Sequence, residues 1–228
     1  DDDIDLGMPR DDYERFLEVA SAALGERFRV TCSRSNPHQA ALFSKVMLVG
    51  TRFVTDETEE AGFDQGVFVD IFPYDAVCSE PNAAKRQRKR CMMWQSLSYL
   101  YHSKHIVVPH KGALGAAEKA ACRIAHYVVR AVLSPERINR GFDKVAMIAK
   151  GDPKSEMLMA SSYAAIEPYP KSMLMPPSVI VFEGKEFFAP ADVEGYLRTQ
   201  YGRTWNQLPP EDQRRNHAPK ELDLGTDS

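Results

Sequence analysis

The sequence predicts an α+β domain in which strands at both ends of the chain enclose a helical insertion. Three patterns support this class. Strand-like alternation dominates residues 1–76, helical periodicity dominates residues 81–150, and a hairpin pattern occupies residues 178–190. The chain has 228 residues, which is the size of one domain. We therefore expect a single domain over residues 1–228.

The first third of the chain is predicted to contain strands and one helix. Charged and apolar residues alternate from Asp3 to Leu6, and this period-two pattern puts Asp3 and Asp5 on one face of a strand. A helix capped by Asp11 or Asp12 follows and ends near residue 25. Further strands are expected over residues 28–32, 42–55 and 66–75.

Residues 81–170 form a predicted helical and basic middle segment. Two long helices are expected there, and a third begins after Ser134 and Pro135. Beyond this segment, the pattern predicts a hairpin that turns at residues 183–185 and a short helix over residues 192–201. A last helix is expected to start at Pro209 or Pro210.

The composition excludes several classes of protein. With 43% hydrophobic and 27% charged residues, and no apolar run of about 18 to 20 residues, the chain is predicted to be neither disordered nor membrane-spanning. Its four cysteines show no CxxC spacing, which argues against a zinc ribbon and favours a reducing compartment. These features predict a soluble, cytoplasmic protein.

Acidic residues on the predicted strands indicate a metal site. Asp3 and Asp5 share one face, where carboxylates repel each other unless a cation neutralises them. Asp70 lies between aromatic residues in GVFVDIF, where an uncompensated charge is costly. If the two strands are neighbours, the three carboxylates meet at one Mg²⁺ or Mn²⁺ ion, which would also take phosphate oxygens. The alternatives are a solvated acidic terminus and a half-exposed strand.

Several sequence blocks resemble the LicD family of phosphotransferases, which includes fukutin-like proteins. In chain order they are DDDIDLGMPRDDYERF, GVFVDIFPYD, FEGKEFFAP, GYLRTQYG and LPPEDQRRNH. The resemblance implies a nucleotidyltransferase-like mixed sheet with flanking helices. It also implies a metal-dependent enzyme that transfers a phospho-alcohol from a CDP-activated donor, such as CDP-choline or a CDP-alditol, to a glycan. CMP would be the leaving group, and a lipid-linked acceptor would bring this cytoplasmic enzyme to the membrane face.

The same resemblance assigns roles to individual acidic residues. The metal ligands match Asp3, Asp5 and Asp70, and the predicted catalytic residues are Asp5 and Asp70. Asp70 either completes the metal shell or takes the proton from the acceptor hydroxyl.

Five further residues are candidates for binding the anionic donor. They are Arg10, Lys45, Arg52, Arg214 and His217. Lys45 lies inside FSKVMLV, so its side chain either reaches solvent or points into the site. Arg214 and His217 match the closing block of the family, or else they belong to a solvated C-terminal helix.

LicD proteins normally carry a helix and a glycine-rich turn before the acidic strand, and this chain lacks both. In nucleotidyltransferase folds that turn holds phosphates through backbone N–H groups. We therefore expect a truncated chain with weak activity at best. Two alternative functions use the same fold: a nucleotidyltransferase that attacks an NTP and releases pyrophosphate, and a non-catalytic module that binds a glycan or a membrane.

Charges are segregated along the chain. Residues 1–80 carry 17 acidic and 7 basic residues, whereas residues 81–154 carry 4 acidic and 15 basic residues. The run KRQRKR from Lys85 to Arg90 predicts a solvated helix face or contact with an anionic membrane. Because no nucleic-acid module is recognised, we expect no nucleic-acid partner.

The predicted helix over residues 113–133 is amphipathic. We expect its apolar stripe to pack on the domain and its basic stripe to face outward with the run at Lys85–Arg90. The apolar stripe consists of Leu114, Ala121, Ile124 and Val128, and the basic stripe consists of Lys119, Arg123 and Arg130. The alternative is internal pairing of these bases with Glu57, Glu59 and Glu60.

Overall fold

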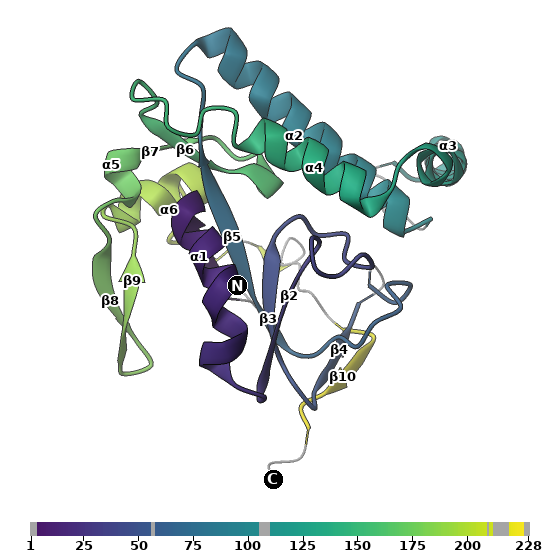
Figure 1. Cartoon of the computed structure of the whole chain (residues 1–228), viewed down its shortest axis with the longest axis horizontal. Coiled ribbons are helices and arrows are strands. Elements are labelled where there is room, and N and C mark those ends of the chain that lie inside the picture. The colour runs from purple at the N-terminus through teal and green to yellow at the C-terminus, as the bar shows by residue number, and fades with distance from the viewer. Residues whose placement is uncertain (1–3, 56–57, 105–109, 209, 212–218, 226–228) are drawn as a thin grey trace.

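A computed structural model describes residues 4–55, 58–104, 110–208, 210–211 and 219–225 (Figure 1). It confirms the α+β class, with a mixed sheet of six strands at the centre. The strands are β1 (Asp5–Pro9), β2 (Phe28–Cys32), β3 (Ser44–Leu48), β5 (Phe68–Ala76), β6 (Met157–Ala160) and β7 (Tyr169–Pro170). They are ordered β2-β3-β5-β6-β7, and β1 pairs with β5. The β1–β5 pair is parallel, whereas the other pairs in this sheet are antiparallel.

Helices and two short ribbons surround the sheet (Figure 1). The helical elements are α1 (Arg10–Leu24), α2 (Pro81–His102), α3 (Gly112–Val132), α4 (Pro135–Ala146), η1 (Ser161–Tyr163), α5 (Lys171–Leu174) and α6 (Val193–Tyr201). One ribbon joins β4 (Arg52–Val54) to β10 (Glu221–Asp223), and the other is the hairpin of β8 (Ser178–Phe182) and β9 (Lys185–Ala189). Over the described ranges, no helix combines the length and the hydropathy needed to cross a bilayer.

β5 is the central strand, and its nine residues serve two faces. Successive side chains on a strand point to opposite faces of the sheet. Phe68, Asp70, Phe72 and Tyr74 therefore share one face, which lines a cavity. Asp75 lies on the other face, where it is almost fully buried.

α1 connects β1 to β2 and packs on the sheet. It begins at Arg10 directly after Pro9, and no side chain caps it, although Asp11 and Asp12 stand in the first turn where acids are favourable. It ends at Leu24 because Gly25 adopts a positive φ of 69°, a backbone conformation that favours glycine. The helix thus ends where the sequence predicts, but it starts at Arg10, about two or three residues earlier than a cap at Asp11 or Asp12 would place it.

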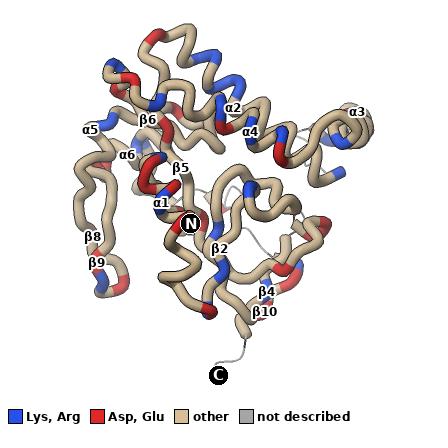
Figure 2. The backbone as a smooth tube through the Cα atoms, in the orientation of Figure 1, with Lys and Arg blue, Asp and Glu red and all other residues tan. Residues whose placement is uncertain are grey.

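A buried ion pair joins α1 to β5. The Arg10 guanidinium donates two hydrogen bonds to Asp75, at 2.7 and 2.6 Å, and both side chains are buried. Burial opposes the charge on Arg10, but the hydrogen bonds and the attraction from Asp75 outweigh it and raise the pKa of Arg10. Glu14 extends the pair towards Arg34, and Figure 2 shows acidic residues gathered at the start of α1. This network holds α1 on the face opposite the cavity.

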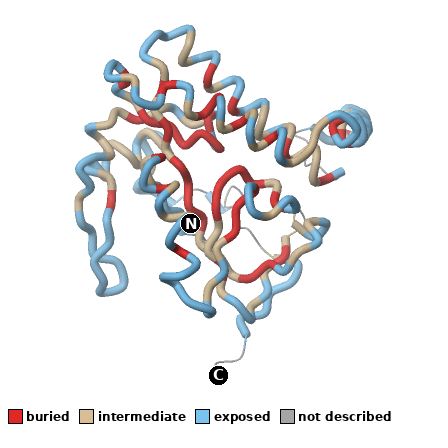
Figure 3. Tube along the Cα trace, viewed as in Figure 1, coloured by how far each residue is buried: buried red, intermediate tan, exposed pale blue. Residues whose placement is uncertain are grey.

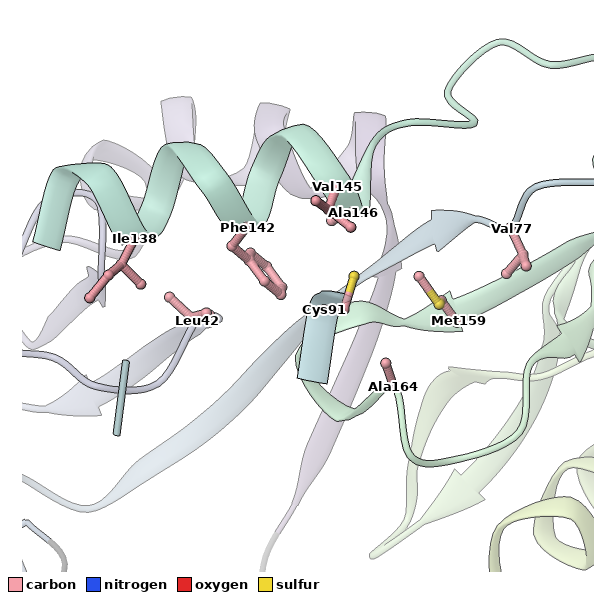
Figure 4. Close-up of a cluster of buried hydrophobic side chains, with 9 residues drawn as sticks. All are labelled: Leu42, Val77, Cys91, Ile138, Phe142, Val145, Ala146, Met159 and Ala164. Atoms are coloured by element: carbon pink, nitrogen blue, oxygen red, sulfur yellow. The ribbon is translucent and has the colours of Figure 1, made fainter. Parts of the chain in front are cut away.

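The main hydrophobic core lies between the helices and the sheet. Figure 3 shows buried residues concentrated in β5 and the facing turns of α2 and α4, whereas β8, β9 and most of α3 are exposed. The core cluster contains Leu42, Val77, Cys91, Ile138, Phe142, Val145, Ala146, Met159 and Ala164 (Figure 4). Burial in this cluster raises the pKa of the Cys91 thiol to about 12, so the thiol stays protonated.

Three predicted elements differ from the structure. The strand expected over residues 42–55 is divided into β3 and β4, because Gly50 turns the chain with a φ of 84°. The α-helices of the middle segment end at Ala146, and the apolar run at residues 157–160 joins the sheet as β6, followed by the short 3₁₀ helix η1. The helix expected from Pro209 or Pro210 falls largely outside the described residues.

The predicted packing of α3 is wrong. Leu114, Ile124 and Val128, which the sequence predicts to be buried, are all more than half exposed. The helix buries Gly115, His126 and Val129 instead. Glycine permits a close approach of the backbone, and the His126 ring contacts the Leu100 carbonyl of α2 at 2.7 Å. The packed face of α3 is therefore the one on which His126 contacts the Leu100 carbonyl, and the more apolar stripe is left exposed.

We predict that Asp75→Asn lowers the free energy of unfolding by about 3 kcal/mol or more, because it leaves the buried Arg10 charge without its main partner. Urea denaturation at neutral pH measures the difference. The matched control is Asp11→Asn, since Asp11 pairs with Lys150 at 2.6 Å on the surface and is 81% exposed. The control should change stability by less than about 1 kcal/mol. Equal effects of the two substitutions would contradict the proposed importance of the buried pair.

Candidate functional site

The candidate site is centred on Asp70, which is buried in the middle of the sheet. In the parallel pair of β1 and β5, Asp70 is the direct neighbour of Asp5. In the antiparallel pair of β3 and β5, it is the direct neighbour of Lys45. Adjacent strands lie about 4.8 Å apart, so two carboxylates and one ammonium group stand in a row across three strands. We call Asp5, Asp70 and Lys45 together the acidic row.

Lys45 and Asp70 form a close ion pair. Lys45 Nζ lies 2.6 Å from Asp70 Oδ1, and the two side chains are only 15% and 12% exposed. The same ammonium lies 3.4 Å from the centroid of the Phe68 ring, in the geometry of a cation–π interaction. Lys45 therefore points into the site, which decides between the two positions that the sequence left open.

These three residues line a cavity of about 410 Å³ on one face of the sheet. A volume of this size is typical of sites for small molecules and cofactors. The walls come from residues 38–41, from the loop after β4, from the C-terminal end of α2 and from α6. Many of the wall residues are aromatic, and they include Phe43, Phe63, Tyr99, Tyr163, Tyr196 and Tyr201.

A group of three tyrosines forms one wall next to the carboxylates. Tyr169 and Tyr196 are stacked with their ring centroids 4.8 Å apart, and Tyr74 lies 6.1 Å from Tyr169. Burial raises the pKa of Tyr74 well above its ordinary value, and Tyr196, Tyr169 and Asp5 add to the rise. The Tyr74 hydroxyl is therefore a neutral group that can donate a hydrogen bond beside the acidic row.

Gly7 creates the room for this wall. A Cβ atom at position 7 would lie 2.4 Å from Cε2 of the Tyr74 ring, so any larger residue would displace that ring. Gly7 is two residues after Asp5 and shares its face of β1. The glycine of the opening motif thus has a packing role in the site.

The predicted site residues separate into three groups. Asp5, Asp70 and Lys45 meet in the cavity. Arg10 is held by Asp75 on the opposite face, and Arg52 pairs with Glu221 in the β4–β10 ribbon. Neither arginine lines the cavity, where the sequence analysis expects a donor-binding base. The remaining three predicted residues, Asp3, Arg214 and His217, lie outside the described residues.

The residues of the acidic row fit a hard divalent cation. In the described part of the chain, no group of three or more histidine, cysteine, aspartate or glutamate residues forms a metal cluster. A pair of carboxylates is nevertheless the protein contribution that Mg²⁺ usually takes, with phosphate oxygens and water completing its shell. Asp5 and Asp70 supply this pair, and with Lys45 they carry a net negative charge that favours a cation.

Comparisons with known proteins found no relative, since no family model, no curated protein and no solved structure matches the chain. The resemblance to LicD proteins therefore depends on the short sequence blocks alone.

We predict that Lys45→Met lowers the free energy of unfolding by about 3 kcal/mol at neutral pH. The substitution removes the ammonium group that pairs with the buried Asp70, and it leaves Asp70 beside the like charge of Asp5. Mn²⁺ should then raise the melting temperature of the variant more than that of the unmodified protein, since the metal replaces the lost charge. Thermal denaturation with and without Mn²⁺ measures both effects.

The control for this experiment is Lys150→Met. Lys150 also lies 2.6 Å from an aspartate, Asp11, but it is 51% exposed. Its loss should cost less than about 1 kcal/mol and create no response to Mn²⁺. If Lys45→Met behaves like Lys150→Met, the acidic row does not concentrate negative charge as described.

Proposed function

We propose that this protein is a LicD-type enzyme on a nucleotidyltransferase-like fold, which transfers a phospho-alcohol from a CDP-activated donor to a hydroxyl group of a glycan. One observation carries the proposal: Asp5 and Asp70 are direct neighbours in a cavity large enough for a small ligand. Two carboxylates at this spacing suit a divalent cation and a diphosphate. The blocks DDDIDLG and GVFVDIF, in which the two residues lie, are also the most specific part of the resemblance.

The walls of the cavity suit the two ends of such a donor. A flat cytosine ring can stack on tyrosines, and a cationic alcohol such as choline is attracted to the faces of aromatic rings. Tyr169 and Tyr196 provide a stacked pair at one wall, and Tyr74 provides a neutral hydroxyl nearby. The aromatic lining therefore supports a donor that combines a base, a diphosphate and a small alcohol.

The proposed reaction is a displacement at the β-phosphorus of the donor. A bond forms between the acceptor oxygen and this phosphorus, and the bond to the bridging oxygen breaks, so that CMP leaves. Asp5 and Asp70 would hold Mg²⁺ or Mn²⁺, and the bound ion would neutralise the phosphate charge. The acceptor hydroxyl gives up its proton. In the alternative in which Asp5 alone holds the metal ion, Asp70, the more buried of the two carboxylates, takes this proton.

Lys45 has a separate part in this proposal. Its ammonium is attached to a flexible four-carbon stem and contacts Asp70 across 2.6 Å before the donor arrives. A phosphate that enters the cavity offers the ammonium a second anionic partner. By turning towards the phosphate, Lys45 would neutralise the donor and at the same time release the Asp70 carboxylate for the proton.

We predict that Asp70→Asn and Asp5→Asn each reduce the release of CMP from CDP-choline or a CDP-alditol by about 100-fold or more. The assay separates CMP by chromatography, with free and lipid-linked oligosaccharides offered as acceptors. Chelation with EDTA should abolish the release and added Mg²⁺ should restore it. Asp223→Asn is the matched control, because Asp223 is an exposed strand residue in the β4–β10 ribbon, and it should leave the rate unchanged.

Other products would overturn the proposal. Release of pyrophosphate from CTP, with no CMP from CDP-alcohols, would indicate a nucleotidyltransferase that uses the same carboxylates. Binding of a glycan that persists in Asp70→Asn, without any turnover, would indicate a non-catalytic module.

A further inference from the structure

α3 stands apart from the sheet and packs on one end of α2 (Figure 1). Its contact face is narrow. Gly115, His126 and Val129 are buried, and His126 contacts the Leu100 carbonyl near the end of α2. The opposite face of this 21-residue helix is exposed over its whole length.

The exposed face is apolar and continuous. It is formed by Leu114, Ala121, Ile124, Tyr127, Val128 and Val132, each of which is exposed. At about 100° per residue these positions fall on one side of the helix, and exposed alanines fill the spaces between them. Monomeric soluble proteins rarely expose a contiguous apolar patch of this kind, so the face marks an interaction site.

The basic residues of α3 lie along one edge of this apolar face. Lys119, Arg123 and Arg130 are exposed and line this edge, and the Arg130 guanidinium also lies over the Tyr101 ring of α2, 5.5 Å from its centroid. The only acidic residue of the helix, Glu118, turns towards the packed face, where its side chain is 29% exposed and contacts His110 at 2.7 Å. An apolar stripe bordered by basic residues alone is the pattern of a helix that lies in the plane of an anionic membrane.

We infer that α3 docks the protein on the surface of a membrane containing anionic lipids. The apolar face would enter the boundary between headgroups and acyl chains, and the basic edge would contact the headgroups. A second copy of the chain is a poorer partner, because pairing two such faces brings like charges together and offers no acidic residue on the exposed face to meet them. The inference depends on α3 alone and is independent of the proposed chemistry in the cavity.

The basic run at Lys85–Arg90 is not part of this surface. Arg88 donates hydrogen bonds to Glu167 at 2.9 Å and to the carbonyls of residues 164–166, so its charge is used within the chain. Arg88 also precedes Leu100 by twelve residues, which places it about 18 Å along α2 from the contact with α3. The run therefore lies apart from the α3 face, although Lys85, Arg86, Lys89 and Arg90 are exposed.

Two of the acidic residues that the sequence offered as internal partners are occupied elsewhere. Glu59 pairs with Lys220 at 2.8 Å, and Glu60 pairs with Lys104 at 3.1 Å. Glu57 lies outside the described residues.

Vesicle binding tests the docking of the apolar face. We expect the full chain to co-sediment with phosphatidylcholine vesicles that contain about 30% phosphatidylglycerol, and far less with pure phosphatidylcholine. The double variant Ile124→Ser/Val128→Ser should reduce partitioning by about tenfold or more. These side chains are 67% and 55% exposed, so the fold should be retained, which circular dichroism checks.

The matched control is Val179→Ser/Val181→Ser in the β8–β9 hairpin. These valines are similarly exposed, at 56% and 71%, but they lie at the other end of the molecule (Figure 1). The control should bind vesicles as the unmodified protein does. An equal loss of binding in the control would overturn the assignment to α3, as would undiminished binding of the α3 variant.

A second comparison tests the basic edge. Arg123→Gln should weaken binding to the anionic vesicles about fivefold, and binding should decline as salt rises above about 0.15 M. Arg86→Gln is the control, because Arg86 is exposed near the start of α2, and it should have no effect. Equal binding to neutral and anionic vesicles would contradict the role of the basic edge.

A third measurement detects insertion directly and does not depend on a loss of binding. Tyr127→Trp places an indole on the exposed face, and its fluorescence should shift to the blue and be quenched by brominated lipid in the anionic vesicles. If vesicles leave this fluorescence unchanged and light scattering shows a dimer that Ile124→Ser/Val128→Ser dissociates, the face joins two copies of the chain and the membrane proposal is wrong.

Discussion

The ion pair between Arg10 and Asp75 fixes how β1 and α1 are placed against β5, the strand on which the candidate site depends. Arg10 follows Asp5 by five residues, and Asp75 follows Asp70 by the same number. Because β1 and β5 are parallel, the bond between Arg10 and Asp75 at one end of the pair fixes Asp5 beside Asp70 at the other. A buried guanidinium and a buried carboxylate cannot separate without a large desolvation cost, so this arrangement resists sliding of the two strands. The same pair attaches α1 to the far face of the sheet, which leaves the face with Asp70 free for the cavity.

Much of the fold could be predicted from local patterns, since α1 and α4 each bury one helical stripe and β5 is a long, mostly apolar strand. The errors occur where a local pattern does not determine the outcome. The sequence of β3 and β4 reads as one extended run, and only the positive φ of Gly50 divides it. β6 and β10 have four and three residues, too few for a period to be recognised, and they exist because a partner strand is present. In α3 the more apolar stripe stays exposed, and the packed face is the one on which His126 contacts the Leu100 carbonyl, so hydropathy did not identify it.

The candidate site was predictable in its centre and not in its walls. Asp5 and Asp70 could be found because a carboxylate in an apolar strand requires a compensating charge. Lys45 could be found because its strand was expected to lie beside the strands of these carboxylates. Arg10 was predicted to bind the donor, but it lies outside the cavity. The sequence shows that a base is present, but it does not show that the carboxylate that binds this base, Asp75, lies 65 residues away. The tyrosine wall has no local signal, because Tyr74 and Tyr196 are separated by 122 residues and meet only when α6 folds back over the sheet.

The spacing of the two carboxylates within β5 also affects how the chain avoids incorrect pairing. Asp70 and Asp75 are an odd number of residues apart and therefore face opposite sides of the sheet, and a slip of β5 by one position would move each to the wrong side. Asp70 would then enter the packed interior without Lys45, while Asp75 would lose Arg10 and leave that guanidinium buried alone. Apolar strands of this kind have little to distinguish one register from the next, and they are the ones that mispair and aggregate. Here the two charges make the alternative register costly, so the residues that serve the site and the interior also protect the strand during folding.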